Sequence, residues 1–246
     1  MRFDEAGPSG YLRSSGFLRF AQDLAWIHSE TAGFGRTWYV ERGLTWLVRD
    51  VELDILEDIP YGTEMVVSTE VIGFRRFWAR RRSEFTDPAA GRVLATAITD
   101  WVLLNSAGKP VRPPADIVAA FPAAPDPFTP LRLELGQPAD GATFIEFAPR
   151  ASELDPMGHV NNAAYLDYLD EQLAQPATQA RRYRVEFLLS AAAGMELLGR
   201  AWPNDRGWSY RLTDSDGREL LRATMETRPR GGVGGGRLRR HPAELA

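Results

Sequence analysis

The amino-acid sequence predicts an α+β fold built from two tandem copies of one unit, each a long helix packed on an antiparallel β-sheet. A helical pattern occurs twice, at residues 15–30 and 162–174, and the two segments align as FLRFAQD over YLDYLDE. Each helical segment is followed by β-rich segments, in which apolar and polar residues alternate between turns of Gly, Pro, Asp or Asn. Because the same order of elements occurs twice, the chain is predicted to contain an internal repeat.

Both helical segments carry apolar side chains at three- and four-residue steps, the spacing of an amphipathic helix. Ser14 or Ser15 can cap the first helix, and Asn161 or Asn162 can cap the second. Each helix is therefore expected to present one apolar face to a sheet. The apolar positions are Phe17, Phe20, Ala21, Leu24 and Ile27 in the first helix, and Tyr165, Leu166, Leu169 and Leu173 in the second.

The segments after each helix also correspond in order. VELDIL at 51–56 aligns with VEFLLS at 185–190, and GTEMVVS at 62–68 aligns with GMELLGR at 194–200. The offset between the copies falls from 148 residues at the helix to 126 at the last strands, so the second copy has shorter connections. The long run IGFRRFWARRRSEFT is expected to form one strand with a bend at Gly73.

These patterns divide the chain into four parts. An N-terminal unit, residues 1–120, is followed by a proline-rich linker at 121–140, because proline cannot occupy a central strand. The C-terminal unit covers 141–228. The tail at 229–246 is rich in Gly and Arg, and we expect it to be disordered.

Composition excludes several kinds of chemistry. The chain has no cysteine and three histidines far apart in sequence, so disulfides, thiolate nucleophiles and iron–sulfur clusters are excluded and no metal or other cofactor is expected. A net charge of −4 gives no support for nucleic-acid binding. The sequence contains neither a membrane-spanning apolar stretch nor a secretory signal pattern, so a cytoplasmic location is expected. Carboxylates, hydroxyls, amides and histidines remain for catalysis.

The most informative segment is SELDPMGHVNNAAYLDYLDE, residues 152–171. Asp155 precedes His159 by four residues, with Pro156 and Gly158 between them, and the chain then enters the second helix. A helix N-terminus offers unpaired N–H groups and partial positive charge to a developing oxyanion. A carboxylate beside it can act as a nucleophile or activate water, and a histidine can orient the acid or donate a proton.

Structural roles are open for the same residues. An Asp and a His four apart are often a capping arrangement, Asn161 and Asn162 are typical cap residues, and Tyr165 has the spacing of a core residue. His28 lies on the first helix, where a packed or exposed position is equally compatible with the pattern.

The full motif, D-x-x-G-H-V-N-N-x-x-Y-L at the start of a helix, resembles the hotdog-fold thioesterases. The whole chain, from about residue 3 to 227, is similar to the acyl-acyl-carrier-protein thioesterases, which carry two hotdog units in one polypeptide. The first half supports the resemblance through GYLRSSGFLRFAQDLAWIHSE and TDWVLLNSAGKPVRPP. The resemblance implies hydrolysis of fatty-acyl thioesters of acyl carrier protein to free fatty acid in fatty acid biosynthesis, with no cofactor.

Carried over by position, the resemblance implies that Asp155 and His159 are catalytic. It places Met157 where the plant enzymes have a catalytic asparagine, and Ser190 and Ala191 where they have an acid and a cysteine. The expected substrate-binding residues are Gly158, Val160, Asn161, Asn162 and Tyr165.

In the first copy, Gly7 and Tyr11 stand at the positions of Asp155 and His159, so the first half is expected to serve as scaffold and acyl pocket. The acyl chain would lie between the two units.

A cluster of arginines, RRFWARRR at 75–82, is the candidate docking patch for an acidic partner. As one strand, this segment would place Arg76, Arg80 and Arg82 on a common face. A solvated sheet face with aromatics under arginine stems is the other interpretation. The resemblance implies that the acidic partner is acyl carrier protein.

Three alternative functions stay open. The chain could be an acyl-coenzyme A thioesterase, or a catalytically impaired acyl-thioester binding protein, given Met157 and Ser190. A dehydratase-like hotdog would need a helix acid facing a histidine, for which Glu171 and His28 are the candidates. The sequence sets neither the acyl chain length nor the oligomeric state, and a homodimer is compatible with it.

Overall fold

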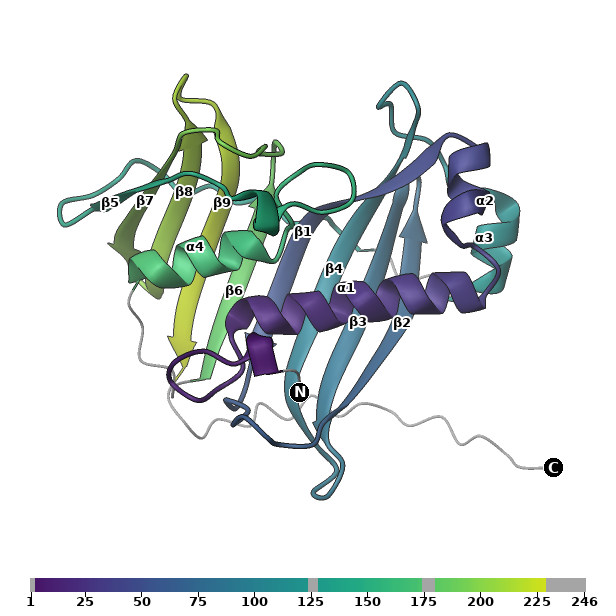
Figure 1. The fold of residues 1–246 in the computed structure, drawn as a ribbon, viewed down its shortest axis with the longest axis horizontal. Helices are drawn as coiled ribbons and strands as arrows, with labels where there is room; N and C mark the ends of the chain where they lie inside the picture. The colour runs from purple at the N-terminus through teal and green to yellow at the C-terminus, as the bar shows by residue number, and fades with distance from the viewer. Residues whose placement is uncertain (1–2, 124–127, 174–179, 229–246) are drawn as a thin grey trace.

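One antiparallel sheet of nine strands forms the centre of the molecule (Figure 1). The computed structural model describes residues 3–123, 128–173 and 180–228, so the tail at 229–246, expected to be disordered, lies outside the described residues. The strand order is β2-β3-β4-β1-β6-β9-β8-β7-β5. The strands are β1 (Leu44–Ile55), β2 (Val66–Arg75), β3 (Trp78–Asp87), β4 (Arg92–Asn105), β5 (Thr143–Phe147), β6 (Ala180–Phe187), β7 (Leu197–Asn204), β8 (Gly207–Asp214) and β9 (Glu219–Arg228).

The strand order is symmetric about the central β1–β6 pair. Outward from this pair, β4, β3 and β2 follow on one side, β9, β8 and β7 follow on the other, and β5 adds an outer strand to the second half. The aligned sequence segments 51–56 and 185–190 fall in β1 and β6, or directly after them. The predicted repeat is confirmed, with the two copies merged into a single sheet.

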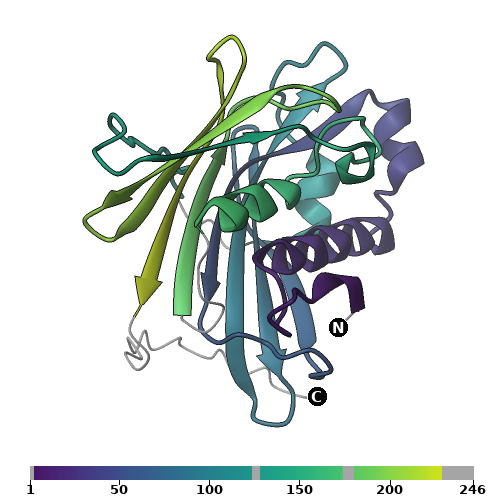
Figure 2. The ribbon, with the colours of Figure 1, turned by 60° about the vertical axis from the view of Figure 1, so that its left-hand side comes forward.

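Both predicted helices are confirmed and lie on the same face of the sheet, as Figures 1 and 2 show. The first is α1 (Ser14–Thr31) and the second is α4 (Ala164–Leu173). Phe17 of α1 is fully buried and meets Phe85 of β3 edge to face, with ring centroids 5.0 Å apart. Leu169 of α4 is also fully buried, in the same core cluster. The α+β class therefore holds, with one core shared by both halves.

Two short helices, α2 (Arg36–Glu41) and α3 (Ala115–Ala120), were not predicted. They lie beside the C-terminal end of α1 (Figure 1). Each has six residues, too few for a helical period to show in sequence. Their buried side chains form a smaller cluster with the loop after α1, made of Phe34, Tyr39, Ile117 and Phe121. The turns η1 (Phe3–Glu5) and η2 (Ala151–Glu153) precede α1 and α4. None of the helices in the described part of the chain is long and apolar enough to cross a membrane.

The prediction of one long strand through residues 72–86 is wrong, because the segment is a hairpin. β2 ends at Arg75, which pairs with Trp78, the first residue of β3. Arg76 makes the turn with a positive φ of 53°, a conformation that glycine or asparagine would normally signal in sequence. The irregularity expected at Gly73 is present as a shift of register between Val71 and Gly73. Arg76 therefore does not share a strand face with Arg80 and Arg82.

Residues 128–136, here named the back strap, cross the face of the sheet opposite the helices. On β3, Arg81 points to the helix side, where it contacts His28, so the alternate Arg80 points to the back. The strap meets strands of both halves in turn. Its bonds are Arg75 Nη1 to the Phe128 carbonyl (2.8 Å), Arg80 Nη2 to the Thr129 carbonyl (3.2 Å), the Leu133 amide to Glu186 Oε2 (3.1 Å), Arg222 Nη1 to the Leu133 carbonyl (3.2 Å) and Arg211 Nη2 to the Gly136 carbonyl (2.8 Å).

Two buried carboxyl groups lie under the strap. Asp50 of β1 and Asp100 of β4 are direct cross-strand partners, with exposures of 2% and 0%. Arg80 donates to both oxygens of Asp100 at 2.7 and 2.6 Å. Burial and the neighbouring Asp100 charge raise the pKa of Asp50 to about 8. Asp50 is therefore protonated in the folded chain at neutral pH, and its O–H can donate to Asp100.

This protonated carboxyl should make stability depend on pH. The pKa of Asp50 is higher in the folded chain than in the unfolded chain, so protonation of Asp50 stabilises the fold. This contribution to the free energy of unfolding is complete below about pH 4 and is lost as the pH rises toward about 8. Asp50→Asn keeps a donor to Asp100 without titrating. We expect its free energy of unfolding to fall less between pH 5 and 8 than that of the wild type, by on the order of 1 kcal/mol or more, in urea titrations. The exposed Asp205→Asn is the control, and equal slopes for Asp50→Asn and wild type would contradict the assignment.

Candidate active site

The loop between η2 and α4 holds Asp155 in a fixed turn. Asp155 Oδ1 accepts hydrogen bonds from the amides of Met157 (2.8 Å) and His159 (3.2 Å), and the Asp155 amide donates to the His159 carbonyl (2.8 Å). Gly158 completes the turn with a φ of 78°, which favours glycine. The second oxygen, Oδ2, makes no hydrogen bond within the described part of the chain. One carboxylate oxygen is thus anchored and the other is available.

The chain after this turn is anchored before it enters α4. The amide of Val160, a buried residue, donates to the Ala191 carbonyl at 2.8 Å. Asn161 Oδ1 accepts from the Ala163 amide at 2.9 Å, so Asn161 closes a turn directly before α4, which begins at Ala164. The following residue, Asn162, makes no hydrogen bond through its amide N–H or side chain within the described residues. Its amide N–H is therefore a free donor just before the helix start.

The same backbone loop precedes α1 in the first half. The Gly7 amide donates to the Tyr11 carbonyl at 2.8 Å, and the Gly10 amide donates to the Gly7 carbonyl at 3.0 Å. Gly10 has a φ of 80°, the counterpart of Gly158. The predicted offset of 148 residues thus aligns the two loops residue by residue. The first copy lacks both the acid and the histidine.

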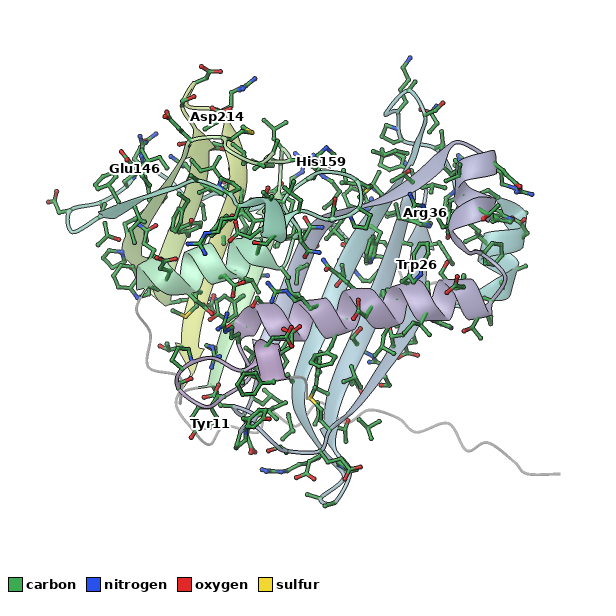
Figure 3. The ribbon with its side chains drawn as sticks, in the orientation of Figure 1. Tyr11, Trp26, Arg36, Glu146, His159 and Asp214 are labelled. Carbon is green, nitrogen blue, oxygen red and sulfur yellow. The ribbon has the colours of Figure 1, made fainter. Side chains whose placement is uncertain are left out.

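A cavity of about 170 Å³ opens beside Asp155 and is lined by both halves of the molecule. The second half contributes the loop and the residues after β6, while the first half contributes α1, β1 and β4. Figure 3 shows His159 between the two halves of the sheet. Seven lining residues belong to the motif and its flank, namely Asp155, Met157, His159, Val160, Asn161, Asn162 and Tyr165; Leu189 and Ser190 follow β6, and Gln22, Trp46, Arg49 and Trp101 come from the first half.

Tyr165 supplies a hydroxyl group to this cavity. Its side chain is 3% exposed, and its oxygen accepts the Ala191 amide at 2.9 Å. Burial raises the pKa of Tyr165, and the nearby Asp155 charge adds to the effect. The phenol is therefore neutral, and its own proton remains free to be donated. Tyr165 is both a core residue and a residue that lines the cavity, so its core spacing in the sequence does not exclude a role in the cavity.

A second cavity, of about 680 Å³, adjoins the first and is lined mainly by the first half. The two cavities share Gln22, Trp46, Trp101 and Met157 in their linings. Trp26 and Arg36, labelled in Figure 3 over the first half, line the larger one. Its remaining wall is mostly apolar and includes Ala25, Val40, Leu44, Val71, Phe74, Ala79, Ile117, Phe121 and Pro156. A polar cavity holding Asp155 thus opens next to a larger apolar one.

Several lining residues were not identified from sequence. The position of Gln22 could have indicated a role in the cavity, because it lies on the same helical face as Leu18 and Ala25, which are buried. A polar side chain on a buried stripe indicates either a bonded core residue or a cavity. Trp46 and Trp101 gave no distinguishing signal, since large aromatics are common in strands.

The arginines proposed for docking are not in either cavity. Arg80 binds Asp100 and its guanidinium lies 4.2 Å from the Phe128 ring centroid, while Arg82 pairs with Glu70. Arg76 is exposed in the β2–β3 turn. Because two of the three charges are already paired, the patch offers less free positive charge than its sequence indicates.

The residues considered for dehydratase chemistry lie apart. Glu171 is exposed near the end of α4. His28 lies near the C-terminal end of α1, against Phe121, whereas α4 contacts the first half near Arg19 through Asp167. The arrangement therefore does not bring this acid and this histidine together. Among the described residues, no group of three or more His, Asp or Glu side chains could hold a metal ion.

The fold is that of tandem hotdog thioesterases, as solved structures show. An oleoyl thioesterase from Lactobacillus plantarum superimposes with a TM-score of 0.82 and 19% identity, covering 93% of this chain and 94% of that one. The 12:0-ACP thioesterase from Umbellularia californica gives a TM-score of 0.78 and 21% identity, covering 93% and 95%.

The family models identify the chain more closely. Residues 1–121 match the acyl-ACP thioesterase N-terminal domain and residues 136–186 match the acyl-ACP thioesterase C-terminal domain. The chain belongs to the acyl-ACP thioesterase family. A chloroplastic acyl-[acyl-carrier-protein] hydrolase from Cuphea viscosissima is 25% identical over 239 residues, and an oleoyl-acyl carrier protein thioesterase from Arabidopsis thaliana is 22% identical over 183 residues. These alignments cover 87% and 67% of this chain but only 57% and 50% of the relatives.

The hydroxyl of Tyr165 should contribute to stability as well as to the cavity. Tyr165→Phe leaves the buried Ala191 amide without an acceptor, which typically costs about 1–3 kcal/mol. We expect the free energy of unfolding in urea to fall by that amount. Tyr61→Phe, an exposed tyrosine, is the matched control. An unchanged stability in Tyr165→Phe would show that the Ala191 amide has another acceptor.

Proposed function

We propose that this chain hydrolyses fatty-acyl thioesters of acyl carrier protein to free fatty acid and carrier protein, as part of fatty acid biosynthesis, in the cytoplasm. The observation that carries the proposal is the junction of the two cavities. The smaller one presents Asp155 and His159, and the larger one is apolar and of a size suited to an acyl chain. Membership of the family and its hydrolase relatives support the same activity.

In this arrangement the acyl chain lies in the first half and the thioester carbonyl lies beside Asp155. The free Oδ2 of Asp155 takes a proton from water as the water oxygen attacks the carbonyl carbon, or attacks that carbon itself in a covalent route. The carbon–sulfur bond then breaks, and the thiolate receives a proton. In the covalent route, a water molecule then hydrolyses the acyl-Asp155 anhydride, which releases the fatty acid and regenerates the carboxylate. His159, exposed at the cavity, is the candidate donor to the leaving sulfur.

The developing negative charge on the carbonyl oxygen needs hydrogen-bond donors. The Asn162 amide and the Tyr165 hydroxyl are two donors of the smaller cavity next to Asp155, and neither has an acceptor within the described residues. Met157 and Ser190, which depart from the plant pattern, also line this cavity. Met157 borders both cavities, so it covers the acyl chain where it meets the thioester.

Asp155→Asn tests the proposed base. Asn105 makes the same turn in this chain, since its Oδ1 accepts from the amides of residues 107 and 109, so asparagine should preserve the loop. We expect kcat to fall about a hundredfold or more with little change in melting temperature. The control is Asp214→Asn in the β8–β9 turn, whose Oδ1 accepts from residues two and four ahead and whose Oδ2 pairs with Arg218.

Single-turnover assays should use acyl-carrier-protein and acyl-coenzyme A substrates of several lengths. Activity of Asp155→Asn within about threefold of wild type would reject the assignment. Wild-type turnover no faster than Asp155→Asn, with tight retention of the thioester, would favour the impaired binding protein instead. Faster turnover of the coenzyme A substrates would favour that carrier.

Docking of the carrier protein can be tested at Arg76, the exposed member of the proposed patch. Arg76→Ala should raise KM severalfold for carrier-bound substrate and leave KM for coenzyme A thioesters unchanged, and added salt should reduce the difference. Arg206→Ala, in the exposed β7–β8 turn, is the control. An equal change on both substrates would show that Arg76 acts on folding and not on docking.

A further inference from the structure

A buried arginine without an acidic partner lies in the wall of the larger cavity. Arg81 is 8% exposed and projects from β3 toward α1. Its Nη1 donates to Thr69 Oγ1 at 3.2 Å and lies 2.9 Å from His28 Nδ1. Among the residues described, no carboxylate lies within ion-pair distance of it. The buried Arg181 differs, since it binds Asp58 at 2.6 Å, and so does the half-buried Arg80, which binds Asp100 at 2.6 Å.

The groups around Arg81 are neutral. Burial and the Arg81 charge lower the pKa of His28, so its imidazole is neutral and Nδ1 accepts the hydrogen bond. The Tyr39 hydroxyl accepts from Trp46 Nε1 at 3.1 Å and lies 3.1 Å from Ser29 Oγ. Burial lowers the pKa of Arg81 only to about 10, so the guanidinium stays charged at neutral pH. Arg81 therefore places a buried, uncompensated positive charge in the wall of the cavity, in addition to the exposed Arg36, which also lines it.

The charge of Arg81 affects which end group of an acyl chain the cavity can bind. A methyl-ended acyl chain that reached Arg81 would displace water and leave the guanidinium without a counter-charge, which is strongly unfavourable in an apolar site. A carboxylate at the end of the chain would instead accept charge-assisted hydrogen bonds from the planar guanidinium. A hydroxyl end would be a weaker acceptor.

We propose that Arg81 is a specificity-determining residue that binds a carboxylate at the far end of the acyl chain. The preferred substrates are then thioesters of ω-carboxyacyl groups, that is, half-thioesters of dicarboxylic acids. The hydrolysis of these substrates rests on the proposed thioesterase function, but the contact between Arg81 and the carboxylate does not.

Equilibrium binding tests the contact without catalysis. In the Asp155→Asn protein, calorimetry should compare a dicarboxylic acid with the monocarboxylic acid of equal length. We expect the dicarboxylic acid to bind at least about tenfold more tightly, a preference that Arg81→Met removes and Arg81→Lys partly keeps. Arg92→Met, at an exposed arginine of β4, is the control. If Arg81→Met fails to fold, Arg81→Gln replaces it, since glutamine retains a donor without the charge.

Hydrolysis assays then test the substrate class. Matched thioesters ending in methyl, hydroxyl and carboxylate should show the highest kcat/KM for the carboxylate, and Arg81→Met should reverse this order in favour of methyl. Equal binding of the dicarboxylic acid by Arg81→Met and its parent, or a wild-type preference for methyl ends, would overturn the proposal. Failure to hydrolyse any thioester, with the Arg81-dependent binding retained, would reject only the thioesterase function.

Discussion

The pairing of β1 with β6 is the interaction on which the rest of the structure depends. These strands pair from Asp50 opposite Glu186 to Ile55 opposite Arg181, and they join two half-sheets into one. Glu52 of β1 binds Arg182 and Arg184 of β6 across this seam. Because neighbouring strands lie about 4.8 Å apart, the pairing fixes the distance between the halves. α1 and α4 then share one face, and the cavity beside Asp155 can take walls from both.

The turn that carries Asp155 is not itself unusual in this chain. Asn105 and Asp214 begin turns with the same hydrogen-bond pattern, each with a glycine three residues later at positive φ. Gly7 begins a fourth without a side chain. The Asp–His spacing thus forms a turn within the loop, closed by the amides of Met157 and His159, before α4 begins at Ala164. What distinguishes Asp155 is the place of its turn at the seam, where Asp155 lines a cavity that the first residues of the other three turns do not line.

Local patterns in the sequence predicted the elements whose signals are local. The periodicity of residues 15–30 and 162–174 predicted both long helices, and the contiguous motif at 155–165 predicted the half of the site that lies on one loop. The other half could not be predicted, because Gln22 and Trp46 reach the cavity only through the β1–β6 pairing. The pairing of charges in the arginine cluster could not be predicted for a related reason. Charge is visible in sequence, but the partners Asp100 and Glu70 become neighbours only once the strand register is known.

Arg80 and Arg81 project from opposite faces of β3 and have different surroundings. On the back, Arg80 neutralises Asp100 beside the protonated Asp50 and holds the strap that crosses both halves. On the front, Arg81 stays charged in the larger cavity and has only neutral neighbours. For the empty fold, an apolar side chain of similar volume would be at least as stable at that position, since a buried charge is unfavourable without a partner. The front face therefore favours an occupant that brings a negative charge to Arg81, whereas Arg80 on the back face already has Asp100 as its partner.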